Sequence, residues 1–253
     1  MAIINNSFLL SSYELITQIA NSSSFFFDLS DLADDLELRP EFTIDNPAGI
    51  RGFNGSDTIV GSSGDDVVNG NQGSDFLFGS TGNDYLRGGK GDDELVGEFG
   101  NNVLNGNIGD DLVLANNGAN FLRGGQGNDF LSGGIDDDIL IGDFGTDLLV
   151  GAGGADTFVL RADTAGFSID NADQISDLNL ADGDRIVIVG NFSFNDIGLF
   201  SARIQPGFGF PVQGTVIERI STGEILGTVT SSIQDVELAL ELVSTSDPAL
   251  FIG

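Results

Sequence analysis

The sequence predicts an all-β chain whose central part is a parallel β-solenoid, and three observations predict it. A nine-residue unit recurs twelve times without insertion or deletion from residue 52 to residue 159. Each unit carries glycines at fixed positions, which suits tight turns, and an apolar residue at its eighth position. Segments rich in β-branched residues follow the block. One unit cannot bury its apolar side chain alone, so neighbouring units must stack into a coil.

The composition excludes several classes of function before any motif is considered. The 253 residues include 39 Asp or Glu, 9 Lys or Arg, and no His or Cys, so the formal net charge is −30. Without Cys there is no disulfide framework or thiolate chemistry, and without His there is no His zinc ligand or histidine general base. Because so acidic a surface repels nucleic acid and anionic lipid, metal cations are the expected partners.

The N-terminal segment, residues 1–51, is expected to be a cap with a short helix. Ser11 and Glu14 have capping-box spacing, and Tyr13, Ile16 and Ala20 share one helical face. A cap is needed because the ends of a coil of strands would expose unpaired edges. The first basic side chain is Arg39, and no stretch reaches the ~20 apolar residues that span a bilayer. We therefore expect no membrane span, and either a cytosolic chain or export without an N-terminal signal peptide.

Residues 52–159 are the repeat block, and its positions are strongly constrained. Glycine occupies the first position in eleven units and the fourth in eleven, Asp the sixth in ten, and an apolar residue the eighth in all twelve. This pattern predicts a tight turn and then a three-residue strand whose middle side chain points inward. The predicted inward residues are Ile59, Val68, Leu77, Leu86, Leu95, Leu104, Val113, Leu122, Leu131, Leu140, Leu149 and Phe158.

The block resembles the G-G-x-G-x-D-x-U-x nonapeptide repeats of the RTX, or haemolysin-type, calcium-binding proteins. This resemblance implies a right-handed parallel β-roll with two units per turn. It also implies calcium between successive turns, held by sixth-position Asp carboxylates and loop carbonyls, and calcium suits such flexible sets of six to eight oxygen ligands. One departure is the second position, which is Gly only at Gly89, Gly125 and Gly134. This departure affects loop stiffness and need not remove ligands.

With two units per turn, odd and even units form opposite edges of the roll. The odd edge is unbroken, whereas the even edge carries Asn102 and Asn120 at the sixth position, Ala115 at a first position and Asp136 at a fourth. We therefore predict five calcium gaps on the odd edge and two on the even edge, between Asp66 and Asp84 and between Asp138 and Asp156, or about five to seven strong sites, with weaker sites around the two Asn. The predicted metal ligands are Asp57, Asp66, Asp75, Asp84, Asp93, Asp111, Asp129, Asp138, Asp147 and Asp156.

A purely structural alternative is that these Asp residues cap turns by accepting backbone N–H bonds. However, carboxylates stacked about 4.8 Å apart repel one another unless a cation separates them. The block has 18 acidic residues and only Arg87, Lys90 and Arg123 as basic ones, so calcium is expected to couple to folding. Extracellular modules often bind calcium with Kd of about 10⁻⁴ to 10⁻³ M, so the chain would be loose where calcium is scarce.

The resemblance also implies export by a type I apparatus that reads an uncleaved C-terminal signal. Residues 247–253, an acidic residue followed mainly by apolar ones, look like some of those termini. The expected location is extracellular or at the cell surface.

Residues 160–253 are expected to form a β-rich C-terminal cap. Strands are predicted at residues 185–189 and at 214–220, the latter paired with 224–230 across a Ser-Thr-Gly turn. Residues 236–243 alternate like a strand but also follow Ser232 as a helix would, so both readings stay open.

The outward face of the odd-unit strands is unusually apolar, because nine of its twelve positions carry apolar residues. We expect a flank, a second copy of the chain or a partner such as polysaccharide to cover it. The apolar positions are Val60, Phe76, Phe78, Val96, Leu112, Leu114, Phe130, Leu148 and Val150.

Catalysis is not expected. Without His there is no zinc site or Ser-His-Asp triad of the usual kind, and the single lysine, Lys90, lies in a repeat loop. The leading hypothesis is a secreted calcium-binding protein that serves as a structural, surface-associated or adhesive module. The alternatives are a carbohydrate-binding accessory protein that uses exposed Phe residues and Tyr85, and an intracellular calcium buffer.

Overall fold

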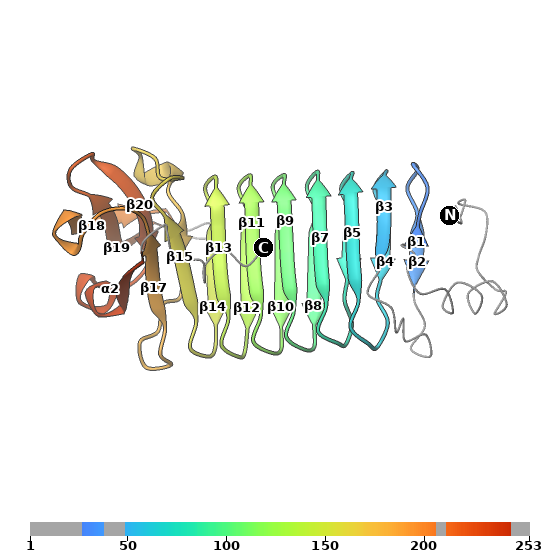
Figure 1. Ribbon diagram of the computed structural model, residues 1–253. Coiled ribbons are helices and arrows are strands. Elements are labelled where there is room, and N and C mark those ends of the chain that lie inside the picture. The colour runs from blue at the N-terminus through green and yellow to red at the C-terminus, as the bar shows by residue number, and fades with distance from the viewer. Residues whose placement is uncertain (1–26, 38–48, 206–210, 244–253) are drawn as a thin grey trace, which may run out of the picture.

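The repeat block coils into a parallel β-solenoid of about six turns, which a C-terminal unit closes at one end (Figure 1). The structure is a computed structural model that describes residues 27–37, 49–205 and 211–243. The expected N-terminal helix around residues 11–20 and the expected export signal at 247–253 lie outside these residues. Within them, no helix is long and apolar enough to cross a lipid bilayer.

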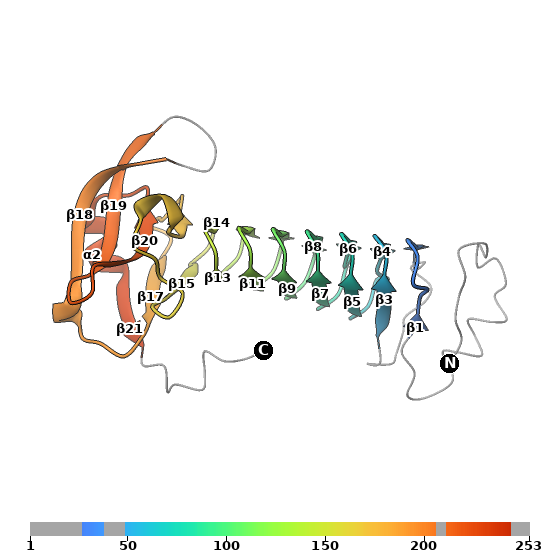
Figure 2. The same cartoon turned by 90° about the horizontal axis from the view of Figure 1, so that it is seen from above.

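The strands form two sheets that face each other along the whole solenoid (Figure 2). Sheet A is parallel, in the order β1 (Phe27–Asp28), β3 (Ile50–Asn54), β5 (Val67–Gln72), β7 (Tyr85–Lys90), β9 (Val103–Ile108), β11 (Phe121–Gln126), β13 (Ile139–Phe144), β15 (Thr157–Arg161), β17 (Arg185–Val189) and β21 (Leu240–Val243). Sheet B has the order β18 (Ile197–Ile204), β19 (Val212–Arg219), β20 (Glu224–Val229), β16 (Gln174–Ile175), β14 (Leu148–Ala152), β12 (Phe130–Gly134), β10 (Leu112–Asn116), β8 (Glu94–Glu98), β6 (Phe76–Phe78), β4 (Thr58–Val60) and β2 (Asp35–Glu37).

The register of these sheets confirms two nine-residue units per turn. Leu77 of β6 pairs with Leu95 of β8, and Leu86 of β7 pairs with Leu104 of β9, so partners are 18 residues apart. Odd units therefore supply the three strand residues of sheet B and even units those of sheet A. Most strands of the block, such as β5 and β8, continue into the first positions of the next unit, whereas β4 and β6 end with their own unit.

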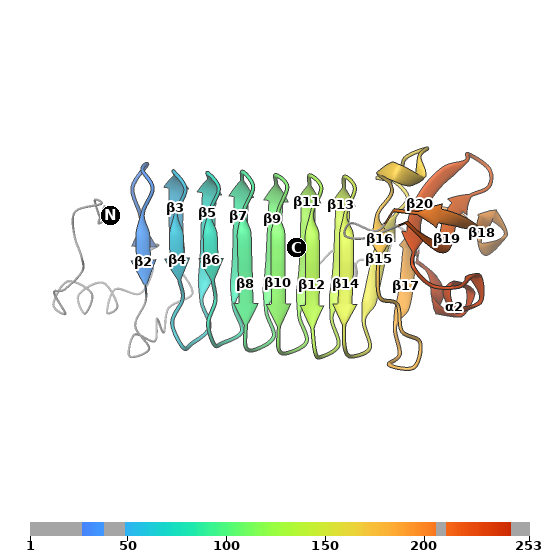
Figure 3. The same cartoon turned by 180° about the vertical axis from the view of Figure 1, so that it is seen from behind.

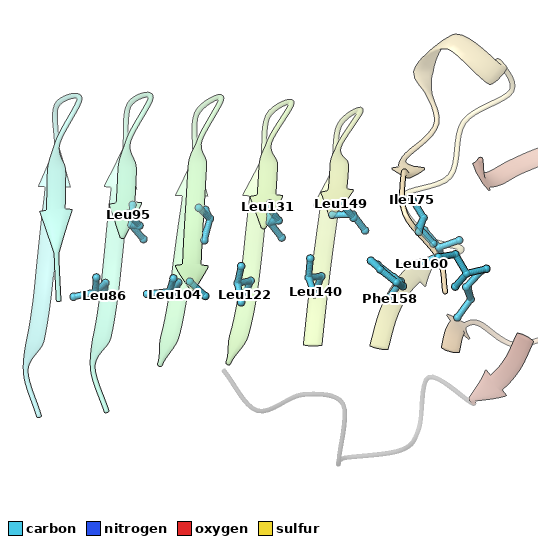
Figure 4. Packing of buried hydrophobic residues seen from close by; sticks show 14 of the residues in the cluster. Leu86, Leu95, Leu104, Leu122, Leu131, Leu140, Leu149, Phe158, Leu160 and Ile175 are labelled. Atoms are coloured by element: carbon cyan, nitrogen blue, oxygen red, sulfur yellow. The ribbon is translucent and has the colours of Figure 1, made fainter. Parts of the chain in front are cut away.

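The core is a continuous row of apolar side chains between the sheets, to which the strands of both sheets contribute. All twelve predicted inward residues are at most 1% exposed, which confirms the eighth-position prediction. Figure 4 shows part of this row, from Leu86 to Phe158. Beyond the block the row continues with Leu36 and Ile50 on one side and Ile175 and Ile186 on the other. Each fully buried Leu or Ile contributes roughly 1.5–3 kcal/mol of transfer free energy, so stacking is the main driving force for the coil.

The C-terminal unit confirms the predicted strands and resolves the ambiguous segment. β17 covers residues 185–189, and β19 and β20 form the antiparallel pair expected across the Ser-Thr-Gly turn (Figure 3). The unit also contains two 3₁₀ turns, η1 (Ile169–Asn171) and η2 (Phe194–Asp196). Residues 233–243 divide between helix and strand: α2 (Ile233–Ala239) begins after Ser232, whose Oγ accepts the Asp235 N–H at 3.2 Å, and β21 follows.

The apolar outward face of sheet B is half-buried in the structure. Its side chains cover one another along the sheet, and Val96 is only 8% exposed. No strand or helix of the described chain lies over this face between β4 and β12 (Figure 2). That a flank, a second copy or a partner covers it stays a prediction.

Candidate metal-binding edges

The sixth-position residues lie in the turns at the two edges of the roll, where the chain passes between the sheets. The ten predicted Asp ligands together with Asn102 and Asn120 are all at most 3% exposed. The odd-unit turns stack along one edge and the even-unit turns along the other, because like turns are 18 residues apart. The structure therefore brings each Asp next to its same-edge neighbours and places the two edges on opposite sides of the core.

On each edge the sixth-position side chains form a hydrogen-bonded ladder. The Oδ1 of each residue accepts the backbone N–H of the sixth-position residue one turn earlier, as in Asp75 Oδ1 with Asp57 and Asp129 Oδ1 with Asp111, both at 2.8 Å. The ten bonds within the block measure 2.7–3.0 Å. Turn capping, the structural alternative, therefore accounts for one oxygen of each carboxylate.

The second carboxylate oxygen has no such partner in most turns. Within the part of the chain that the structure describes, eight Oδ2 atoms are buried and accept no hydrogen bond, although a buried carboxylate without donors is costly. A cation would satisfy them, because an ionised carboxylate can only accept. All six odd-edge Asp residues are in this set, but only two from the even edge. The eight residues are Asp57, Asp75, Asp93, Asp111, Asp129, Asp147, Asp84 and Asp138.

The glycine positions of the repeat follow from this packing. A Cβ at Gly70, a first position, would overlap Asp75 Oδ2, so glycine lets the carboxylate lie against the backbone. A Cβ at Gly73, a fourth position, would overlap the carbonyl oxygen of Gly55 one turn earlier. The turns are thus stacked backbone against backbone, and each unpartnered oxygen lies against the first-position glycine of its own unit.

Burial changes the acidity of these carboxyl groups. The pKa of Asp93, Asp111 and Asp129 is raised from 3.8 to about 7, chiefly by desolvation and further by the carboxylates of neighbouring turns. Hydrogen bonds from the backbone N–H groups lower the pKa but do not offset burial. Without a cation the edges therefore hold carboxyl groups that resist ionisation at neutral pH.

The donor set along the edges fits a hard cation. The available atoms are all oxygens, from carboxylates and from turn carbonyls such as those of Gly73 and Gly91. Calcium takes six to eight oxygen ligands, including backbone carbonyls, at flexible geometry. Among the described residues no three acidic side chains converge on one point that could hold a metal. Carbonyl oxygens must therefore complete any site.

Where Asn replaces Asp on the even edge, the side-chain amide donates hydrogen bonds to oxygens of the turns. Asn102 Nδ2 donates to Gly100 O at 3.2 Å, and Asn120 Nδ2 donates to Gly118 O at 2.5 Å and to Asp138 Oδ1 at 3.0 Å. Each amide group thus supplies a donor of its own to the turn. The departure at Ala115 falls in the same unit as Asn120, and Ala115 is buried.

Both ladders extend beyond the repeat block, which the sequence analysis missed. Asp34 N–H donates to Asp57 Oδ1 at 2.8 Å, Asp147 N–H to Asp173 Oδ1 at 3.2 Å, and Asp156 N–H to Asp184 Oδ1 at 2.9 Å. Asp34, Asp173 and Asp184 are out of the nine-residue phase, since they lie 23, 26 and 28 residues from their partners. The signal that could have found them is a buried apolar residue two places later, respectively Leu36, Ile175 and Ile186.

Serine closes the first turn of each ladder that the structure describes. The N–H and Oγ of Ser62 donate to Asp66 Oδ2 at 2.6 and 3.0 Å, and those of Ser30 donate to Asp34 Oδ2 at 2.7 and 2.8 Å. In both cases the serine precedes its Asp by four residues. These N-terminal carboxylates therefore have donors for the oxygen that stays unpartnered farther along the roll.

The fifth positions form a second, exposed set of bonds that the repeat pattern did not predict. Asp92 Oδ1 accepts Asp110 N–H at 2.9 Å, and Asp110 Oδ1 accepts Asn128 N–H at 2.7 Å. Here the amide of a later turn donates to a side chain of the earlier turn, opposite in direction to the buried ladder. The two sets together link each turn of the edge to both of its neighbours.

Comparison with known proteins identifies the repeat. The family model of the RTX calcium-binding nonapeptide repeat, which spans four copies of the unit, matches residues 51–86, 78–113, 87–122, 114–149 and 123–158. No curated protein matched the chain. The matched residues contain the ten Asp residues of both ladders and the row of buried eighth-position side chains. Residues 51–158 of this chain are therefore RTX calcium-binding nonapeptide repeats.

Proposed function

We propose that the chain is a secreted module whose roll folds when calcium binds along its two edges. The observation that carries the proposal is the set of eight buried Oδ2 atoms without a hydrogen-bond donor, repeated at one position of successive turns. Structural turn caps would not need that second oxygen to be buried and unpartnered. Calcium, when bound, supplies the positive charge that such oxygens lack.

The proposed ligands are the ten sixth-position Asp residues, with five sites on the odd edge and two on the even edge. The even-edge pattern supports the first of the two even-edge sites. Of the two unpartnered oxygens on this edge, that of Asp84 belongs to a carboxylate bonded to the turn of Asp66, whereas that of Asp138 belongs to a carboxylate bonded to the turn of Asn120. The turns of Asn102 and Asn120 between them use amide donors instead.

Calcium dependence of folding follows from linkage. A site filled at a free calcium concentration tenfold above its Kd stabilises the folded state by roughly 1.4 kcal/mol, so five such sites contribute about 7 kcal/mol. This is comparable with the whole stability of a small domain. We therefore infer a chain that is unfolded at the low calcium of a cytosol and folded outside the cell. An unfolded chain suits export, and the roll between its two caps would then act as a structural, surface-associated or adhesive element that presents the outward face of sheet B.

The test is a calcium titration of the metal-free chain followed by far-UV circular dichroism, with magnesium as the control. We expect a cooperative gain of β signal at about 0.1–1 mM calcium, no equivalent change with magnesium, and about five to seven ions bound at the plateau. A spectrum already fully β in chelator and unchanged by calcium would assign the Asp residues to turn capping alone. It would then refute the proposed function.

A further inference from the structure

We infer that the outward face of sheet A binds an acidic polysaccharide, in which some of the sugars carry carboxylate groups, along a row of basic and amide side chains. Between β3 and β11 no strand or helix that the structure describes lies over this face (Figure 2). The inference rests on the proposed function only in that the face exists when the roll is folded. It concerns side chains on the sheet opposite to the apolar face of sheet B, away from the two acidic edges.

Sheet A holds every basic residue of the repeat block. The strands β3, β5, β7, β9 and β11 contain four basic residues and no Asp or Glu, although the whole chain has 39 acidic residues. The strands of sheet B from β4 to β12 contain no Lys or Arg. The roll therefore carries its positive charge on one face, between two acidic edges. The four basic residues are Arg51, Arg87, Lys90 and Arg123.

Three of the basic side chains form a straight row at a regular spacing. Arg51 is aligned with Asn69, and Asn69 with Arg87. Asn105 is aligned with Arg87 on one side and with Arg123 on the other. All five directly follow a buried residue of the core row, so their side chains point outward. Because neighbouring strands lie about 4.8 Å apart, the arginines recur about every 9.6 Å.

This spacing favours a polymer of low charge density. A polysaccharide with a carboxylate on every second sugar offers negative charges at a similar repeat. Duplex DNA instead carries one negative charge about every 1.7 Å along its axis, and the acidic edges on both sides of the row would repel so dense a charge. Charge complementarity therefore indicates a carboxylated sugar polymer that lies across the strands.

Arg87 and Lys90 are the unpaired positive charges of this face. Neither side chain forms an ion pair or a hydrogen bond with any residue that the structure describes, and Arg87 Nε is buried without an acceptor. Arg51 and Arg123, at the two ends of the row, are instead paired with Asp residues of sheet A. A buried N–H without an acceptor is costly, and a ligand carboxylate would supply acceptors in the geometry that a guanidinium group prefers.

The uncharged side chains around these two residues suit the hydroxyl groups and rings of sugars. Asn105 lies beside Arg87 and Gln72 beside Lys90, and neither amide group is hydrogen-bonded within the described part of the chain. Each amide can both donate and accept, as a hydroxyl group requires. Tyr85, two residues before Arg87 on the same face, is 38% exposed and offers an apolar ring surface with a polar tip. The face thus combines isolated positive charges with hydrogen-bonding amides and an exposed ring.

The test is the binding of short fluorescent hyaluronan oligosaccharides to the full chain at saturating calcium, measured by fluorescence anisotropy. Hyaluronan alternates a carboxylated sugar with a neutral one. Dextran, which has no carboxylate, and an oligodeoxythymidylate of similar length are the comparison ligands. We expect hyaluronan to bind with an affinity that falls as salt is added, and both comparison ligands to bind at least about tenfold more weakly.

The decisive variant is Arg87→Gln, which should weaken hyaluronan binding by about tenfold or more because a charge-assisted hydrogen bond is lost. The substitution breaks no side-chain bond among the described residues, so circular dichroism at saturating calcium should be unchanged. Arg87→Lys, which keeps the charge but loses the planar fork, should have an intermediate affinity. The matched control is Arg203→Gln in β18, which removes an exposed, unpaired arginine of the C-terminal unit and should leave binding unchanged.

Each other outcome overturns the inference in a recognisable way. If Arg87→Gln binds hyaluronan as tightly as the wild type, this face does not hold the ligand; hyaluronan held through calcium at the edges would give that result. An equal loss in Arg203→Gln would show an effect of net charge alone. Equal binding of dextran, or tighter binding of the oligodeoxythymidylate, would show that the ligand class is wrong. A chain that is fully folded in chelator would refute the proposed function, whereas a calcium-folded chain that binds no hyaluronan would refute only this inference.

Discussion

The second position of the repeat has positive φ in eleven of the twelve units, although only three of these residues are glycine. Phe53, Glu98, Asp143 and Ala152 have φ values of 77°, 70°, 72° and 73°. The left-handed conformation costs a non-glycine residue roughly 1–2 kcal/mol. The departure from glycine noted in the sequence therefore has an energetic consequence, namely backbone strain distributed along both edges.

We predict that Ala152→Gly stabilises the calcium-loaded chain by about 1 kcal/mol, because it removes this strain and because the exposed methyl group of Ala152 packs in no core. Thermal unfolding at saturating calcium should show a higher midpoint. The matched control is Ser62→Gly, at the one second position without positive φ. It removes the hydroxyl donor to Asp66 and should lower the midpoint; a lower midpoint for Ala152→Gly as well would contradict the strain argument.

At the scale of the element, the even edge differs from the odd edge through the groups that close its turns. The odd-edge turns all carry an unpartnered carboxylate oxygen, whereas Asn102 and Asn120 donate an amide hydrogen to the carbonyl of their own turn. The middle of the even edge should therefore hold together without metal while the odd edge does not.

The double variant Asn102→Asp, Asn120→Asp tests this difference. We predict that it binds more calcium than the wild type, and that it is less stable in chelator by about 1–3 kcal/mol, because two buried amide donors become carboxylates that lack one. Calorimetric titration and chemical unfolding in chelator would measure the two effects. The control is Asn101→Asp, which adds charge at an exposed fifth position and should change neither. An unchanged ion count in the double variant would show that these turns cannot hold calcium at all.

At the scale of the whole molecule, the buried carboxyl groups of the edges make stability depend on pH, and calcium changes that dependence. The folded-state pKa of Asp57, Asp93, Asp111 and Asp129 is about 7, raised mainly by desolvation from an ordinary value of 3.8. Between these values the folded chain holds more protons than the unfolded chain. Its stability without calcium is therefore greatest at low pH and falls as the pH rises toward 7.

We predict that the decalcified chain has a higher unfolding temperature at about pH 5 than at about pH 8. In excess calcium the difference should shrink or reverse, because protons compete with the cation for the same oxygens. Thermal unfolding of dialysed protein at both pH values, with and without added calcium, measures this. A metal-free chain that becomes more stable as the pH rises would contradict the assigned pKa direction.

Most of the roll could be predicted from sequence because its determinants recur in phase. Leu104, for example, is buried because the eighth residue of every unit points inward. Asp111 lies in a turn because the sixth residue of every unit does. Asp173 and Asp184 could not be found in this way. Their loops have other lengths, so only the folded sheet places them in the ladder. Likewise, Ser62 has no phase that distinguishes it from Ser80, and only its bonds to Asp66 reveal its role.

The hydrogen bonds of the buried ladder all point in the same direction along the roll. The sixth-position amide of each turn is satisfied by a side chain one turn closer to the C-terminus, as Asp57 N–H is by Asp75. A roll shortened from its N-terminal side keeps an acceptor for every remaining amide in the ladder, whereas one shortened from its C-terminal side leaves a buried amide bare. Synthesis begins at the N-terminus, so each new turn lacks the acceptor for its sixth-position amide until the next turn on the same edge has been made. The last amides on the two edges find their acceptors only when Asp173 and Asp184 have been made.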